Sequence, residues 1–239
     1  MVRQKPQRLA DAYPGGEGAV FKNREEAGRL LAERLIAYRG TPEGIILALP
    51  RGGVPVGYAL SLSLRLPLDV FITRKLGAPG NPEYAIGAVT ETGSVFLNPS
   101  AQQVMAALGA PASYLAEAVG AERQEIARRQ AMYRQGRPLP DLTDRTVVLV
   151  DDGIATGATF LASVDALRTC GVRHLVAAIP VGPLDTLRVV RNKVDSLCTL
   201  MTPEPFYAVG NHYADFTQVE DSQVLRYLAD AAAAQRPHS

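Results

Sequence analysis

The chain has 239 residues, of which 47% are hydrophobic and 21% are charged, so it can bury the core of one α/β domain or of two small ones. Its formal net charge of +1 creates no strong field of either sign, which argues against nucleic acid or an anionic membrane surface as a partner. Two cysteines are too few for a disulfide framework and predict small buried side chains in a reducing compartment.

Residues 1–20 are rich in proline, glycine and charge, and they predict a flexible N-terminal arm ahead of a single domain over residues 21–239. The arm lacks the apolar stretch of a signal peptide, and no later apolar run is long enough for a membrane span. We therefore expect a cytoplasmic protein that does not enter a membrane. Residues 23–40 then predict an amphipathic helix, with Asn23 as its N-cap and Gly40 as its stop.

Short apolar runs rich in β-branched residues predict strands that are buried on both faces of a parallel sheet. Helical stretches such as residues 159–171 lie between them, and this alternation is typical of a doubly wound α/β fold. The predicted strands cover residues 44–50, 68–74, 146–150, 174–181 and 196–202.

The first predicted strand is followed by Arg51, Gly52 and Gly53 at the start of a predicted helix. This turn combines a guanidinium group with two unobstructed backbone amides, which suits an anionic ligand such as a diphosphate. An ordinary glycine-rich turn between a strand and a helix has the same composition, so that alternative stays open.

The second predicted strand ends at Arg74 and Lys75, and a segment with two glycines and two prolines follows. Adjacent side chains on a strand diverge, so one of these two cations should point into the flank of the sheet. Residues 85–98 predict a hairpin that turns at Thr92 and Gly93 and is attached to the main sheet.

Residues 98–143 predict a helical insertion that becomes increasingly charged. The arginines of residues 123–137 could form a substrate clamp or a solvated helix face, and we expect the solvated face.

The stretch VVLVDDGIATGAT, residues 147–159, combines a buried strand, two neighbouring carboxylates and a turn of small residues before a helix. The strand delivers Asp151 and Asp152 to the carboxyl edge of the sheet, where ligands bind in open α/β folds. The turn and the helix N-terminus suit a phosphate dianion, with Thr156 and Thr159 as additional donors. A phosphate monoester beside carboxylates that accept from vicinal hydroxyls describes a ribose 5-phosphate.

This stretch resembles the phosphoribosyl pyrophosphate (PRPP) signature of type I phosphoribosyltransferases, and the similarity extends over roughly residues 23–220. The resemblance implies transfer of the 5-phosphoribosyl group from PRPP to a nitrogen acceptor, such as a nucleobase or similar heterocycle, with release of pyrophosphate. It also implies Mg²⁺ held mainly by PRPP and water, with no dedicated protein ligands. Many members of the family are dimers with the site near the interface, so a homodimer stays open.

The resemblance assigns a role to each motif. Asp151 and Asp152 would bind the ribose, and the 5′-phosphate loop would consist of Ala155, Thr156, Gly157, Ala158 and Thr159. The pyrophosphate loop would consist of Arg51, Gly52 and Gly53, with a non-proline cis peptide bond near Arg51.

In the family, basic residues before a mobile loop contact the diphosphate while the loop excludes water from the reacting centre. Lys75 is the first candidate for that contact and Arg74 the second. Glu83 would accept the proton of the nucleophile, because NPEYAIG resembles the Glu-Tyr loop of adenine phosphoribosyltransferases. A solvated loop carboxylate is the alternative for Glu83.

Residues 203–217 resemble the hood of hypoxanthine-type enzymes, with Phe206, Val209 and Asp215 at the positions that contact the acceptor base. These aromatic residues could equally belong to the core. The strand at 174–181 ends without the lysine or arginine that reads a 6-oxo group, which argues against a 6-oxopurine acceptor.

Two other functions stay open. A non-catalytic regulator could sense PRPP and bind nucleic acid or a protein through the basic helix at 123–137, although the near-neutral charge makes nucleic acid the weaker partner. A metal-dependent hydrolase of sugar phosphates is less well supported, because further carboxylate or histidine ligands at suitable spacing are lacking.

Overall fold

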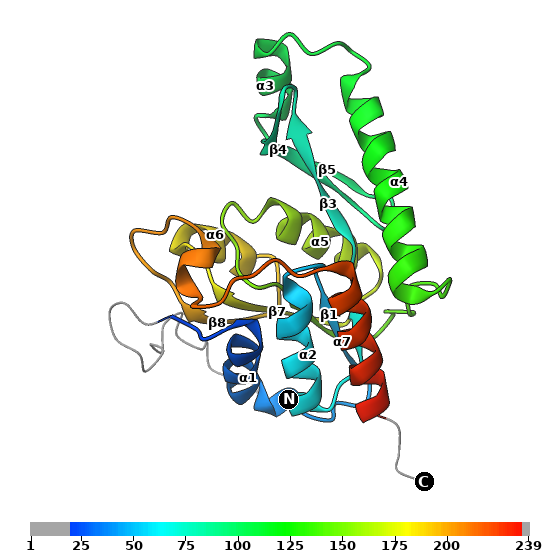
Figure 1. Ribbon diagram of the computed structural model, residues 1–239. Coiled ribbons are helices and arrows are strands. Elements are labelled where there is room, and N and C mark those ends of the chain that lie inside the picture. Colours follow the sequence, from blue (N-terminus) through cyan, green and yellow to red (C-terminus); the bar gives the residue numbers. More distant parts are fainter. Residues whose placement is uncertain (1–19, 236–239) are drawn as a thin grey trace.

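A parallel sheet of five strands forms the centre of the computed structural model, which describes residues 20–235 (Figure 1). The strands lie in the order β2-β1-β6-β7-β8, and every neighbouring pair is parallel. Their bounds are β1 Gly44–Ala48, β2 Leu68–Val70, β6 Thr146–Val150, β7 His174–Val181 and β8 Ser196–Met201. The doubly wound α/β fold predicted from the apolar runs is therefore confirmed. The predicted N-terminal arm lies outside the described residues, apart from Val20.

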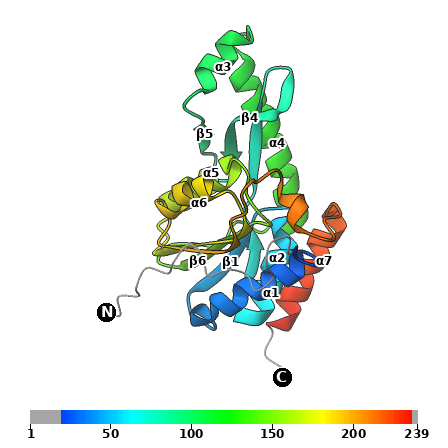
Figure 2. The same ribbon diagram turned by 90° about the vertical axis from the view of Figure 1, so that its left-hand side faces the viewer.

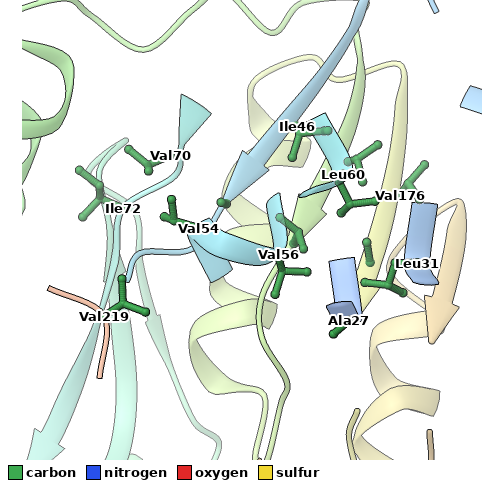
Figure 3. Close-up of a cluster of buried hydrophobic side chains, with 14 of the residues drawn as sticks. Ala27, Leu31, Ile46, Val54, Val56, Leu60, Val70, Ile72, Val176 and Val219 are labelled. Atoms are coloured by element: carbon green, nitrogen blue, oxygen red, sulfur yellow. The ribbon is translucent and has the colours of Figure 1, made fainter. Parts of the chain in front are cut away.

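Helices cover both faces of this sheet, as Figures 1 and 2 show. One face is covered by α1 (Arg24–Arg34), α2 (Gly53–Leu64) and α7 (Asp221–Ala234), and the other by α5 (Ala158–Thr169) and α6 (Leu184–Arg191). The side chains of the central strands β1, β6 and β7 alternate between two hydrophobic clusters. In β1, Ile46 packs in the cluster that contains α1 and α2 (Figure 3), whereas Leu47 packs in the cluster that contains α5. This alternation explains why the central strand β1 is apolar along its whole length.

The predicted helix at 23–40 begins as expected but ends earlier. The side chain of Asn23 accepts a hydrogen bond from the backbone N–H of Glu26, which caps α1. The N–H of Leu35 bonds to the carbonyls of both Leu31 and Ala32, and the chain then tightens into a short 3₁₀ helix, η1 (Ile36–Tyr38).

A second, antiparallel sheet corrects two predictions. The expected strand at 68–74 divides into β2 and β3 (Thr73–Ala78), because the chain leaves the parallel sheet at Phe71 and Ile72. β3 pairs with β4 (Asn81–Thr90), and β4 pairs with β5 (Val95–Leu97). The predicted hairpin at 85–98 therefore exists, but it belongs to a separate three-stranded sheet. The segment that was expected to be a mobile loop is mostly β3 and β4.

This small sheet, with α3 (Ala101–Ala107) and α4 (Tyr114–Arg134), forms an extension of residues 73–134 that projects from the parallel sheet (Figures 1 and 2). The hydroxyl of Tyr114 donates to the carbonyl of Gly77 at 2.9 Å, and Arg74 pairs with Glu122 at 2.7 Å. These contacts hold α4 along the hairpin of β3 and β4.

The basic end of α4 is only partly the solvated face that was expected. Arg134 is 1% exposed and pairs with the buried carboxylate of Glu91 and, at 3.1 Å, with Asp69 in β2 of the parallel sheet. The N–H of Ile72 donates to the same Glu91 carboxylate at 2.7 Å. Arg128 and Arg129 lie one to two turns earlier and pair with Glu125. The buried guanidinium therefore joins the extension to Asp69 of the sheet, and the Glu91 carboxylate that holds it is bonded to Ile72 just after β2.

Across residues 20–235, none of the helices combines the length and apolar character that a membrane span requires.

Cys170 and Cys198 are free thiols; Cys198 is buried, and burial raises its pKa to about 12. Cys170 is only half-buried.

The strand order determines where a ligand can bind. From β1 the chain continues to β2 on one side, whereas β6 continues to β7 on the other. The carboxyl ends of β1 and β6 therefore meet at the point where the winding direction reverses, which is where open α/β sheets hold ligands.

Candidate functional site

The loops that follow β1 and β6 are in direct contact. A β-carbon on Gly52 would lie 2.1 Å from Oδ2 of Asp152, and one on Gly53 would lie 2.8 Å from the carbonyl oxygen of Val150. The peptide bond between Pro50 and Arg51 is cis, at the position that was expected. Two motifs about a hundred residues apart thus form one surface, and glycine is required where their backbones approach.

The two carboxylates are half-buried in this surface. Oδ1 of Asp151 accepts a hydrogen bond from the backbone N–H of Asp152 at 2.9 Å, and the Asp152 side chain is 14% exposed. Burial and the neighbouring charge of Asp152 raise the pKa of Asp151 well above its ordinary value. Burial also raises the pKa of Asp152, although the charge of Arg24 acts in the opposite direction. The pair is costly to keep ionised without a ligand that donates hydrogen bonds.

Arg24 was missed by the sequence reasoning, although it contacts this pair. Its Nε donates to Oδ2 of Asp152 at 2.7 Å, across 128 positions of the chain. One signal was available. Arg24 directly follows the N-cap Asn23, at the positive end of a helix dipole, where carboxylates rather than cations are favoured. A buried arginine at this position needs a nearby carboxylate.

The small-residue turn after Asp152 forms a cavity of about 130 Å³. Gly157 adopts a left-handed backbone conformation (φ +73°) as the N-cap of α5, and a β-carbon there would lie 2.7 Å from Cγ2 of Thr186. The hydroxyl of Thr186 donates to the carbonyl of Ala155 at 2.8 Å, which holds the turn in place. The cavity is lined by Lys75, Ala85, Asp151, Gly153, Ile154, Ala155, Thr156, Gly157, Ala158 and Thr159.

The two neighbouring cations of β3 point in different directions. Lys75 lines the cavity beside Asp151, whereas Arg74 faces α4 and pairs with Glu122 at 2.7 Å. β3 is tied at its base to α5, the helix that follows the small-residue turn, because the hydroxyls of Thr73 and Ser163 are 2.7 Å apart. The structure thus brings only Lys75 of the two to the cavity. The backbone of Glu83 lies in β4, and its side chain lies outside the part that the structure describes.

Arg51, in the loop after β1, lies against the start of α7. Its guanidinium is 3.7 Å from carboxylate oxygens of Glu220 and Asp221. The hydroxyl of Tyr133 donates to Asp221, and this hydrogen bond lowers the pKa of the Asp221 carboxyl. Arg51 is therefore held by carboxylates that an incoming anion would have to replace.

The hood residues are spread over two places. A β-carbon on Gly153 would lie 2.5 Å from Cγ1 of Val209, so Val209 packs directly on the turn after Asp152. The ring of Phe206 stacks on His212 at 5.6 Å. Asp215 lines a different cavity of about 140 Å³, together with Arg24, and accepts hydrogen bonds from Thr217.

The remaining aromatic residues of the hood differ in exposure. Tyr213 is buried in the core, whereas Tyr207 is 78% exposed. Among residues 20–235, no three side chains of histidine, cysteine, aspartate or glutamate gather as they would around a metal ion.

Comparisons with known proteins agree with this geometry. A family model described as a phosphoribosyl transferase domain matches residues 19–201. A Mycobacterium tuberculosis protein provisionally named a phosphoribosyl transferase is 41% identical over 209 residues, which cover 87% of this chain and 46% of that protein. The chain thus spans about half the length of the curated relatives it matches. The crystal structure of TT1426 from Thermus thermophilus is 39% identical, with a TM-score of 0.73, and the match covers 88% of this chain and 98% of that one.

Proposed function

This chain belongs to the phosphoribosyl transferase domain family, and on that premise we propose that it transfers the 5-phosphoribosyl group of PRPP to a nitrogen acceptor and releases pyrophosphate. One observation carries the proposal. The loops after β1 and β6 meet at the switch point of the sheet and join a half-buried carboxylate pair to a small-residue cavity at the start of α5. Lys75 approaches the same cavity from the extension.

The carboxylate pair and the cavity fit the ribose 5-phosphate end of the donor. The 2′- and 3′-hydroxyls donate to Asp151 and Asp152, and these bonds offset the cost of burying the two charges. The 5′-phosphate occupies the turn from Ala155 to Thr159, where backbone amides and the N-terminus of α5 favour an anion. Each charge-assisted hydrogen bond contributes about 1.5–3 kcal/mol.

The diphosphate end of the donor lies toward Arg51, Gly52 and Gly53. Arg51 exchanges its contacts with Glu220 and Asp221 for the diphosphate, which presents more negative charge. Magnesium enters as part of the substrate, because diphosphate and water supply the oxygen ligands that it prefers and it stabilises the charge of the leaving group.

The reaction forms a bond between the acceptor nitrogen and C1 of the ribose while the bond from C1 to the diphosphate oxygen breaks. The electron pair of that bond leaves with pyrophosphate, and the acceptor loses its N–H proton. Lys75 lines the cavity between the 5′-phosphate turn and Asp151, and we propose that its long side chain reaches from there to the leaving oxygens and stabilises the negative charge that develops on them. Glu83 remains our proposal for the group that accepts the proton, and Phe206, Val209 and Asp215 for the acceptor side.

We propose as acceptor a nitrogen heterocycle that lacks a 6-oxo group. A lysine or arginine that would bind such a group is expected at the end of β7, and Gly182 and Pro183 stand there instead. The alternative of a PRPP-sensing regulator loses its main support in the extension. Arg128 and Arg129 pair with Glu125, and Arg134 is buried with Glu91, so these arginines are engaged within the chain.

Calorimetry with PRPP and Mg²⁺, followed by measurement of pyrophosphate release across a panel of nucleobases, tests the proposal. We expect heat of binding in the wild type, its loss in the double variant Asp151→Asn/Asp152→Asn, and pyrophosphate release with at least one base. Binding without release for any base would favour the regulator. No heat from the wild type would refute both readings.

A further inference from the structure

Arg24 stands at an electrostatically unfavourable place unless its charge has a function there. It is the first residue of α1, it is 8% exposed, and the helix dipole at this end repels a cation. Burial of an arginine is tolerated only where carboxylates or carbonyls satisfy its donors. The donors of Arg24 are satisfied by groups from two distant segments, the loop after β6 that holds Asp152 and the hood at residues 203–217.

The guanidinium of Arg24 joins these two segments. Its Nε donates to Oδ2 of Asp152 at 2.7 Å, and its Nη1 donates to the backbone carbonyl of Thr217 at 2.9 Å. The ring of Phe216 lies 3.8 Å from the guanidinium carbon, a cation–π contact that fixes the plane of the fork. The orientation of the Asp152 carboxylate is therefore set from the hood through Arg24.

A second contact holds the backbone of Asp152 from the same side. The hydroxyl of Tyr213 donates to the Asp152 carbonyl at 2.5 Å. The hood is itself fastened to the residues before α1, because the N–H of Ala214 donates to the carbonyl of Phe21 and the N–H of Phe21 donates to the carbonyl of His212. Asp152 thus has its main chain and its side chain fixed by one connected unit.

We infer that Arg24 is a positioning residue, which turns Oδ2 of Asp152 toward α1, presents Oδ1 to a ribose hydroxyl, and couples donor binding to the hood. The inference rests on the proposed function, since it concerns the carboxylate that grips the ribose. Gly52 also lies against Oδ2, so this oxygen is committed to contacts within the protein, and we assign Oδ1 to the ligand.

The charge of Arg24 has a second consequence, which a packing role would not have. The titratable and charged groups that face Asp152 are Arg24 from α1, Asp151 from its own loop and Tyr213 from the hood. Burial raises the pKa of the Asp152 carboxyl and Arg24 lowers it, so loss of Arg24 raises it further. A ribose hydroxyl donates best to the ionised carboxylate. As the pH is lowered, PRPP binding by a chain without Arg24 should therefore be lost at a higher pH than binding by the wild type.

The test compares Arg24→Gln and Arg24→Lys with Arg29→Gln, which removes an exposed arginine from the same helix. We expect Arg24→Gln to weaken PRPP–Mg²⁺ binding roughly 10- to 100-fold and to move the acid limb of its pH profile upward. Arg24→Lys, which keeps the charge but not the fork, should restore the position of the acid limb and only part of the affinity. Arg29→Gln should match the wild type in both measurements.

A variant that keeps Arg24 covers the case in which Arg24→Gln does not fold. Phe216→Leu removes the ring below the guanidinium and should weaken PRPP binding without moving the acid limb. Unchanged affinity and pH profile in the Arg24 variants, or in Arg24→Lys and Phe216→Leu if Arg24→Gln is unfolded, would overturn the inference. Failure of the wild type to bind PRPP would instead remove the proposed function itself.

Discussion

Gly52 lies so close to Asp152 that a β-carbon on the glycine would be 2.1 Å from Oδ2 of the carboxylate, which is too close for two atoms that are not bonded. Gly52→Ala must therefore push the Asp152 carboxylate from its place or move the loop after β1. We expect donor affinity, measured by calorimetry, to fall roughly 10-fold or more. Gly120→Ala is the control, because its added β-carbon meets no atom within 4 Å and should stabilise α4 by roughly 0.5–1 kcal/mol. Normal binding by Gly52→Ala would contradict the role of this contact.

Asp151→Asn should make the ligand-free chain more stable while it weakens donor binding. The unfolded chain releases the Asp151 proton near the ordinary pKa of 3.8, whereas the folded chain holds it to a higher pH. The wild type therefore loses stability as the pH rises from about 4 through the raised pKa. Asparagine avoids this loss and keeps an acceptor for the N–H of Asp152.

Calorimetric melting of Asp151→Asn and the wild type across pH 4 to 8 measures this effect. The gain in Tm should be small at the acid end and should grow toward neutral pH, at roughly 2–4 °C for each 1 kcal/mol. A variant that melts below the wild type at pH 8 would show that the carboxylate stabilises the fold.

Lys75 and Arg74 offer a matched pair of neighbouring cations. Lys75 lines the cavity with Asp151, whereas Arg74 pairs with Glu122 on α4. Lys75→Gln should lower kcat/KM for the donor roughly 10- to 100-fold, because it removes a charge-assisted contact. Arg74→Gln should leave kcat/KM close to the wild-type value. Steady-state pyrophosphate release measures both variants, and the opposite ranking would mean that the extension presents its other face to the donor.

Arg134→Met tests the buried ion pair that joins the extension to the parallel sheet. It leaves the carboxylates of Glu91 and Asp69 without their cation, so unfolding in urea should show a loss of about 3–5 kcal/mol. Arg128→Met, on the same helix but exposed, should unfold close to the wild type. Equal midpoints for the two variants would show that Glu91 takes up a proton or finds another donor.

The parts of the site that sequence reasoning found are those whose neighbours are close in the chain. Asp151 and Asp152 directly follow a fully buried strand, and the turn after them leads directly into a helix, so local pattern places both at the carboxyl edge of the sheet. The loop at Arg51 follows the same logic after β1. The parallel sheet could be predicted for the same reason, because strands buried on both faces are mostly apolar, as β1 is at every position.

The parts that were missed depend on partners far along the chain. Nothing near Arg24 in sequence indicates that a carboxylate 128 positions later will receive its Nε. The burial of Arg134 likewise depends on Glu91, which a charged helical stretch does not reveal. The extension was misread because glycine and proline indicate a loop, whereas Gly77, Gly80 and Pro82 here accommodate an irregular hairpin between β3 and β4.

The central position of β1 and β6 also governs how the chain can be made. Gly44 is synthesised long before its sheet neighbour Thr146. Until β6 has been made, β1 has only β2 beside it. No strand can pair with β6 until the whole extension has been synthesised. The hydrogen bond from Arg24 to the carbonyl of Thr217 forms later still. Nascent chains that stop within the extension should therefore expose the apolar edge of β1 and depend on chaperones, and the complete site should form only after Thr217 has been synthesised.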